Sequence, residues 1–166
     1  MFKEIKAEEI NENVFKLIGK EWMLISAMHN NKVNAMTASW GGLGVMWNKN
    51  VAFIVVRPQR YTKTLLDPAQ GFSLSFFGQE ERKMLNYMGT VSGHNEDKMA
   101  KAGLSVKLEN DIPYYDEARM VLFCTKLFTQ PYQADAFLDK AILPKWYPEN
   151  DLHTLYIGEI TKVLTK

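Results

Sequence analysis

The chain has 166 residues, of which 46% are hydrophobic and 12% aromatic, a size and composition typical of one globular domain spanning residues 1–166. With 20 Lys and Arg against 19 Asp and Glu, the net charge is +1, which excludes a broad electrostatic field for nucleic acid or an anionic membrane. The lone cysteine excludes an intramolecular disulfide and a cysteine-based metal site, and the 3 scattered histidines do not favour a metal enzyme.

The N-terminus carries charges where a signal peptide needs an apolar stretch, and no apolar run reaches the length of a membrane span. The sequence therefore predicts a cytoplasmic protein. Cys124 lies within an apolar run, so we expect it to be buried rather than to act as a nucleophile. The three histidines are interpreted as ordinary polar residues.

The first predicted elements are a helix and a hairpin. Residues 8–20 have apolar side chains at helical spacing, and Gly19 would end that helix. Residues 22–28 and 33–40 are typical of two strands joined by a polar turn. The three glycines within residues 41–44 allow close approach of a ligand or another strand.

The apolar run at residues 51–56 predicts a strand buried on both faces. The later elements are helical turns at 60–67, 79–88, 96–102 and 133–138, and strands at 71–77, 119–129 and 152–164. The alternation within 71–77 places Phe72, Leu74 and Phe76 together on one face. Asn95 is expected to cap the helix at 96–102. Because these strands do not alternate with long helices, the pattern favours an antiparallel barrel with helices at its ends over a parallel doubly wound sheet.

Three segments could carry chemistry. Arg57–Thr62 follows a strand and offers two guanidinium groups, a hydroxyl and the start of a helix, which can bind a phosphate; two solvated arginines are the alternative. Asn34–Trp40 could bond the polar edge of a flat heterocycle and cover its face, or be a barrel strand with a Thr/Ser face. Gly89–Lys98 has hydroxyls and a lysine that could meet a phosphate, or is a capped helix with a solvated lysine.

Several separated motifs occur in one order along residues 12–165. They are Asn34-x-Met36-Thr37-Ala38-Ser39-Trp40-Gly41-Gly42-Leu43-Gly44, Trp47-Asn48, Arg57-Pro58-x-Arg60-Tyr61-Thr62, Ser75-Phe76-Phe77, and Gly89-Thr90-x-Ser92-Gly93 with Asp97-Lys98. This ordered set resembles flavin-reductase-like FMN-binding proteins, including flavoredoxins. The resemblance implies a mainly β fold with peripheral helices, an antiparallel Greek-key split β-barrel of the FMN-binding type. It also implies non-covalent FMN near a homodimer interface.

The resemblance also implies the residues that hold the cofactor. The isoalloxazine would be faced by Asn34, Met36, Thr37, Ala38, Ser39 and Trp40, and the ribityl phosphate by Arg57, Arg60, Tyr61 and Thr62. Further flavin contacts would come from Ser75, Phe76 and Phe77, while Thr90, Ser92, Gly93 and Lys98 would complete the phosphate side or approach the flavin. Lys98 could stabilise negative charge on reduced flavin. Residues 130–146 match less clearly, which leaves the surface for an electron donor unassigned.

Since the flavin carries the redox chemistry, no catalytic side chain is expected. The resemblance implies an FMN-dependent oxidoreductase that moves electrons from NAD(P)H through FMN to a flavin, metal or protein acceptor. The alternative is a flavoredoxin-like electron carrier reduced by a protein partner. The glycines at 41–44 lack the spacing of a dinucleotide fingerprint, which neither excludes nor supports transient nicotinamide stacking. A colourless preparation that takes up no FMN would instead favour a barrel-shaped interaction protein.

Overall fold

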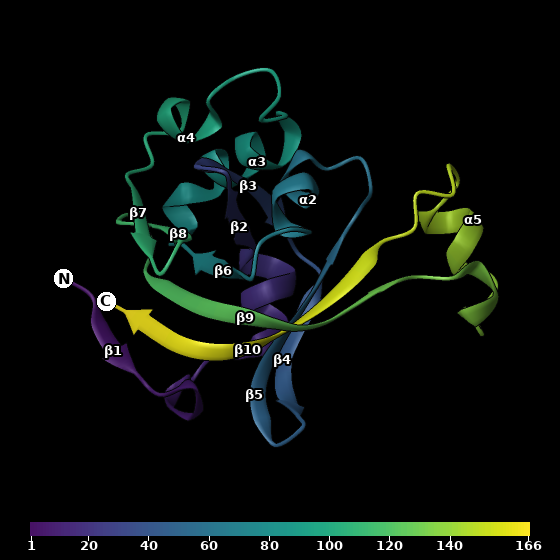
Figure 1. Cartoon of the computed structure of the whole chain (residues 1–166), viewed down its shortest axis with the longest axis horizontal. Coiled ribbons are helices and arrows are strands. Elements are labelled where there is room, and N and C mark those ends of the chain that lie inside the picture. The colour runs from purple at the N-terminus through teal and green to yellow at the C-terminus, as the bar shows by residue number, and fades with distance from the viewer.

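An antiparallel sheet forms the framework of the computed structural model, which describes residues 1–166 (Figure 1). Its strands are β1 (Lys3–Ile5), β2 (Met23–His29), β3 (Lys32–Ala38), β4 (Gly41–Met46), β5 (Lys49–Val56), β6 (Gly71–Phe76), β9 (Met120–Pro131) and β10 (Thr154–Thr165). They pair in the order β3-β2-β6-β9-β10-β5-β4, with β1 added to β10. Because β3 and β4 at the ends of this path do not pair, the sheet curls without closing, as expected for a split barrel.

Short helices and one hairpin surround the sheet. The helices are η1 (Ala7–Glu9), α1 (Val14–Lys16), the π-helix η2 (Leu17–Glu21), α2 (Tyr61–Leu66), η3 (Gln79–Glu81), α3 (Arg82–Thr90), α4 (Lys98–Lys101), η4 (Ala134–Ala136) and α5 (Ile142–Trp146). The hairpin pairs β7 (Val106–Glu109) with β8 (Ile112–Tyr115). The predicted mainly β fold with peripheral helices is confirmed. None of these helices combines the length and apolarity needed to cross a membrane.

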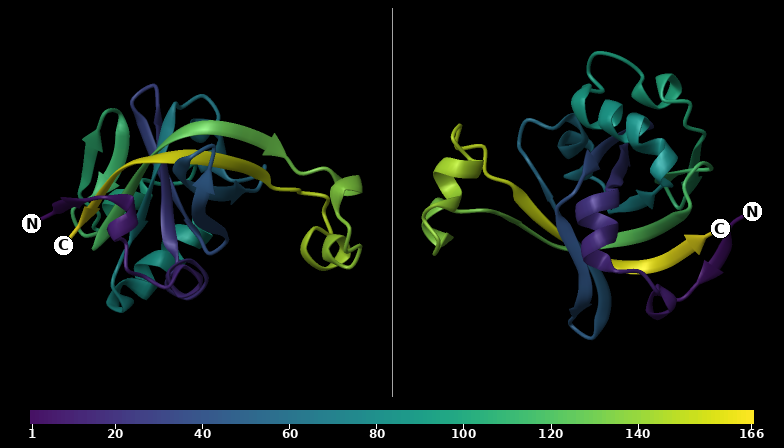
Figure 2. Two further views of the ribbon diagram at one scale, coloured as in Figure 1. Left: turned by 90° about the horizontal axis from the view of Figure 1, so that it is seen from below. Right: turned by 180° about the vertical axis from the view of Figure 1, so that it is seen from behind.

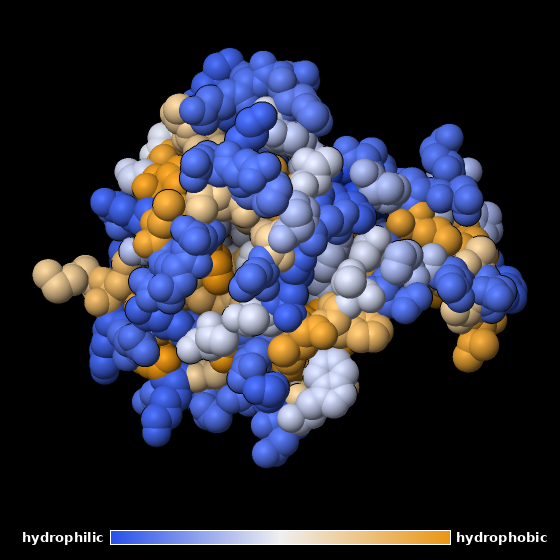
Figure 3. Space-filling view, in the orientation of Figure 1, coloured by the Kyte–Doolittle hydropathy of each residue, from blue (hydrophilic) through white to orange (hydrophobic).

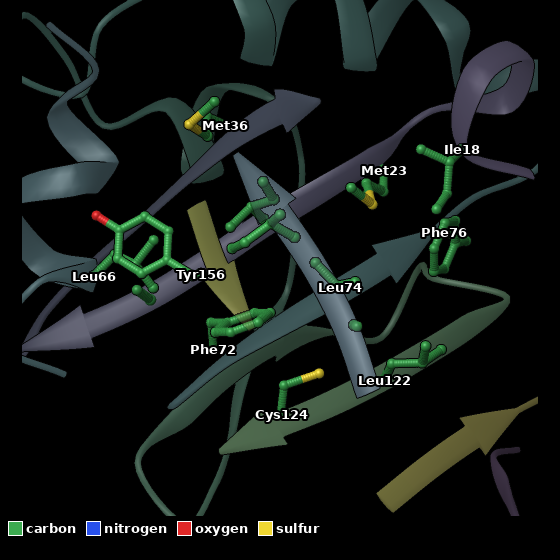
Figure 4. Packing of buried hydrophobic residues seen from close by; sticks show 14 of the residues in the cluster. Ile18, Met23, Met36, Leu66, Phe72, Leu74, Phe76, Leu122, Cys124 and Tyr156 are labelled. Carbon is green, nitrogen blue, oxygen red and sulfur yellow. The ribbon is translucent and has the colours of Figure 1, made fainter. Parts of the chain in front are cut away.

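Side chains of the same strands enter two separate hydrophobic clusters because their direction alternates along a strand. On β9, Leu122 and Cys124 face the cluster inside the barrel, whereas Val121 and Phe123 face the cluster beneath α3, α4 and β8. Figure 4 shows Cys124 beside Leu122 in the first cluster. Cys124 is fully buried, which confirms its prediction, and burial raises the pKa of its thiol. The predicted clustering of Phe72, Leu74 and Phe76 is also confirmed.

Residues 132–153 leave the body between β9 and β10 and carry η4 and α5 (Figures 1 and 2). We call this segment the arm. Its base is closed by a hydrogen bond from the backbone N–H of Tyr132 to the carbonyl of His153, at 2.9 Å. The two strands that border the arm form the longest pairing in the sheet, so the base of the arm is held by the barrel itself.

Several predicted boundaries are wrong for local reasons. The helix expected at 8–20 is broken into short turns, and it runs past Gly19 to end at Trp22, whose φ is 73°. Helix α4 is capped by Asp97, whose carboxylate accepts the Ala100 N–H at 3.1 Å, and not by Asn95. Strand β5 is not buried on both faces along its whole length, since Phe53 and Val55 are half-buried. Strands β1, β4, β7 and β8 and helix α5 were not predicted.

Candidate functional site

Two neighbouring hollows lie where β3, the end of β5 and the start of α2 meet. The first, of about 200 Å³, is lined by Met36, Thr37, Ala38, Ser39, Trp40, Val55, Arg57, Arg60 and His153. The second, of about 170 Å³, is lined by Asn34, Met36, Gln59, Arg60, Tyr61, Thr62, Thr90, Val91, Ser92, Gly93 and Lys98. We call them the indole hollow and the cation hollow. Met36 and Arg60 line both, so the two hollows adjoin each other.

The cation hollow contains two positive charges that no carboxylate balances. Lys98 is 2% exposed, and its Nζ donates to the carbonyl of Met88 at 2.9 Å. Arg60 Nη1 donates to the carbonyl of Gly89 at 2.8 Å, so the end of α3 holds both cations. Neither side chain has a carboxylate oxygen within 4 Å. An anion is the ligand that this arrangement suits.

Electrostatics in this hollow follow from burial. Loss of solvation, and then the positive charge of Arg60, lower the pKa of Lys98 to about 8. Burial also lowers the pKa of Arg60, which nevertheless stays charged because guanidinium is not deprotonated in proteins. A bound anion would raise the pKa values of both groups again. The hollow is therefore costly to keep cationic while it holds no anion.

The polar wall of the cation hollow is closely packed. Asn34 Nδ2 donates to Thr62 Oγ1 at 2.9 Å, and both residues are buried. A Cβ on Gly93 would lie 2.2 Å from Asn34 Oδ1 and 2.8 Å from Tyr61 Cδ1. The loop that carries Gly93 can approach β3 and α2 so closely only because this residue has no side chain.

The indole hollow is aromatic and opens to solvent. Trp40 is 39% exposed, and its ring centroid lies 5.2 Å from that of Trp146 and 5.2 Å from that of His153. His153 Nδ1 lies 2.7 Å from the Tyr147 hydroxyl. Burial and the charge of Arg57 lower the pKa of His153 to about 4, so its imidazole is neutral at pH 7. These rings form a wall suited to a flat heterocycle.

Two predicted residues line a hollow whose chemistry differs from the role expected of them. Arg57 was expected near the phosphate, but it lines the indole hollow and pairs with Asp151 at 2.5 Å. Its second nitrogen donates to the carbonyl of Trp146 at 2.9 Å, so this guanidinium anchors the arm. Asn34 was expected beside the isoalloxazine, but it lies in the cation hollow, where Thr62 occupies its amide.

Three predicted contacts line neither hollow. Ser75 and Phe76 are buried in β6, and Phe77 follows at its end with 2% of its surface exposed. Strand β2 pairs with β3 on one side and β6 on the other, so it separates β6 from the strand that borders the hollows. Phe76 and Phe77 belong to the two hydrophobic clusters instead. The other predicted residues line at least one hollow.

Four residues of the hollows escaped the sequence prediction: Val55, Gln59, Val91 and His153. His153 is the most informative. The pairing of Thr154 with Val56 places it beside Arg57, although 96 positions separate the two along the chain. Only the pairing of β10 with β5 could have revealed this neighbour, and no local motif encodes it.

A larger cavity of about 810 Å³ lies elsewhere, between the β2–β3 turn and the β7–β8 turn. None of the predicted site residues lines it. Its one lysine, Lys162, bonds Glu109 at 2.8 Å, so the cavity offers no unbalanced positive charge. Size alone therefore does not mark the functional site.

Several solved structures share the fold of this chain. No curated protein matches the chain. Flavoredoxin from Methanosarcina acetivorans is 23% identical, with a TM-score of 0.72 over 99% of this chain and 76% of that one. An FMN-binding domain of a flavin reductases-like enzyme from Shewanella baltica is 14% identical, with a TM-score of 0.72 over 99% and 77%. Flavoredoxin of Desulfovibrio vulgaris (Miyazaki F) is 21% identical, with a TM-score of 0.70 over 98% and 77%.

At these identities the solved structures establish a shared fold. The family model described as "Flavin reductase like domain" matches residues 15–166, which include both hollows and the whole arm. The chain therefore belongs to the flavin reductase like domain family.

Proposed function

We propose that this chain binds FMN non-covalently, with the phosphate in the cation hollow and the isoalloxazine at the indole hollow, and that it works as an oxidoreductase. The observation that carries the proposal is the pair of half-buried Arg60 and buried Lys98, without a carboxylate, beside an aromatic hollow. A monophosphate ester on a flat ring system matches both chemistries at once. Riboflavin would satisfy only the aromatic half.

The residues of the two hollows would bind FMN and orient its ring. Arg60 and Lys98 would hold the phosphate, with the hydroxyl groups of Thr90 and Ser92 nearby in the same hollow. Met36 and Trp40 would border the flat ring, and neutral His153 would add no charge to that wall. FMN, when bound, supplies hydride and electron transfer. No side chain acid, base or nucleophile is needed.

The electron source is part of the proposal. NAD(P)H would reduce bound FMN, which would pass electrons to a flavin, metal or protein acceptor. Trp40 and Trp146 are 39% and 44% exposed, which leaves the indole hollow open to an incoming nicotinamide. The same opening would serve the second candidate function, a flavoredoxin-like carrier reduced by a protein partner.

The visible absorption spectrum of the purified protein tests the cofactor, and anaerobic addition of NADH or NADPH in the same cuvette tests the donor. Flavin absorption followed by rapid bleaching is expected. Absorption without bleaching would favour the electron carrier. A protein that neither purifies with FMN nor takes it up would contradict the proposal.

Trp40→Phe should alter the fluorescence and reduction rate of bound flavin, because Trp40 borders the indole hollow and lies largely outside the two hydrophobic clusters. The melting temperature of the FMN-free protein should change little. Trp22→Phe is the matched control for the flavin signals, since Trp22 is half-buried against Arg82 and lines neither hollow. A loss of stability without a spectral or kinetic change would show that Trp40 has only a packing role.

A homodimer is also proposed. Exposed apolar side chains lie on the arm and beside the place where β4 crosses β9 and β10, as Figure 3 shows. They include Leu138, which is 94% exposed, Val45, which is 69% exposed, and Trp47, which lies 6.4 Å from Phe128. A second copy would remove these surfaces from water. Sedimentation should give twice the chain mass; a monomer with stoichiometric FMN would refute the dimer.

A further inference from the structure

Lys98 is a buried ammonium group with a single protein partner. It is 2% exposed, and its Nζ donates one hydrogen bond to the carbonyl oxygen of Met88, with an N···O distance of 2.9 Å. Arg60 lines the same hollow and adds a second positive charge. Two cations therefore share one small space whose walls supply carbonyl and hydroxyl oxygens but no negative charge.

The charged and titratable groups around Lys98 do not compensate it. On its own helix, Asp97 caps the Ala100 N–H, and Lys101 pairs outward with Glu96. From the preceding loop, His94 stacks on Tyr61 of α2 with ring centroids 3.9 Å apart. The remaining charged group is Arg60, at the start of α2, and the facing β3 presents the uncharged Asn34.

We propose that binding of the FMN phosphate is coupled to uptake of a proton by Lys98, so that the site binds FMN more tightly at neutral pH than in alkaline solution. The inference rests on the proposed function, because FMN is the phosphate ester that the cation hollow would take. The protonation state of Lys98 would then control the affinity for FMN.

The direction follows from charge. In the FMN-free protein, burial and Arg60 lower the pKa of Lys98 to about 8, so the lysine loses its proton above that pH. A bound phosphate, with a charge of about −1.5 to −2 at pH 7, favours the protonated lysine and raises its pKa again. Affinity is then constant with respect to Lys98 below pH 8 and falls above it. Arg60 stays charged throughout, so it cannot cause this dependence.

Calorimetric titration with FMN at pH 7 and pH 9, in buffers of different ionisation enthalpy, measures both affinity and proton uptake. The Kd should rise about tenfold between these pH values, with nearly one proton taken up per FMN at pH 9 and about 0.1 at pH 7. Riboflavin lacks the phosphate, so its Kd should stay nearly constant, without proton uptake.

Two variants sharpen the test. Lys98→Gln keeps a hydrogen-bond donor for the Met88 carbonyl, and it should bind FMN more weakly with a nearly flat pH profile. Lys101→Gln on the same helix should keep the profile of the native protein, because Lys101 is exposed. A flat FMN profile in the native protein overturns this inference while leaving FMN binding intact. Failure to bind FMN at pH 7 overturns it together with the proposed function, and neither measurement requires a variant to fold.

Discussion

Arg60→Ala should lower the affinity for FMN about 10- to 150-fold, because loss of a hydrogen bond to a charged group costs about 1.5–3 kcal/mol. Arg60 lines both hollows, and its guanidinium makes one hydrogen bond to the protein, to the Gly89 carbonyl, so its remaining donors are free for a phosphate. Quenching of flavin fluorescence during titration gives the Kd. The affinity for riboflavin should change far less. The decisive quantity is therefore the affinity for FMN divided by the affinity for riboflavin, called here the FMN-to-riboflavin ratio.

Arg57→Ala is the matched control for that experiment. Arg57 is an arginine of the same motif, but Asp151 and the Trp146 carbonyl already occupy its guanidinium. Its loss should loosen the base of the arm and lower the affinities for FMN and riboflavin by similar factors. If Arg57→Ala lowered the FMN-to-riboflavin ratio and Arg60→Ala did not, the phosphate would belong to the other end of the site.

Gly93→Ala should weaken FMN binding roughly 5- to 150-fold, since forcing one extra carbon into a packed site costs about 1–3 kcal/mol. The new Cβ would overlap Asn34 Oδ1 and press on Tyr61, both in the wall of the cation hollow. The loop must then move away from β3, and it carries Ser92, which lines the same hollow. The Kd for FMN and the melting temperature should both be measured.

Gly19→Ala provides the control for a glycine substitution without crowding. Nothing lies within 4 Å of a Cβ placed there, and Gly19 does not have a positive φ. This variant should bind FMN like the native protein. Unchanged FMN affinity in Gly93→Ala would show that the loop can move without affecting the site.

Much of the site could be predicted because its contributions are local. The segments around Trp40, Arg60 and Ser92 are contiguous motifs, and each presents its side chains from one short strand end, helix start or loop. Their order along the chain was enough to indicate one binding site. The apolar alternation of β6 likewise predicted correctly that Phe72, Leu74 and Phe76 share a cluster.

The geometry departs from the sequence prediction where long-range pairing decides the outcome. Ser75 belongs to a motif, but the position of β6 between β2 and β9 buries it away from the hollows. Arg57 and Arg60 look equivalent in sequence, yet Asp151, which lies far along the chain, neutralises only the first. His153 enters the site through the pairing of β10 with β5. None of these three outcomes follows from residues within ten positions of the side chain concerned.

The complete burial of Cys124 makes this chain a convenient host for site-specific labels. A thiol that is the only one in the chain, fully enclosed and with a raised pKa, gives little background with maleimide or spin-label reagents. A cysteine introduced by Lys140→Cys, at an exposed position on the arm, would therefore be the single reactive sulfur. A probe attached there would report the surroundings of the arm in the native barrel, without removal of any native residue from the core.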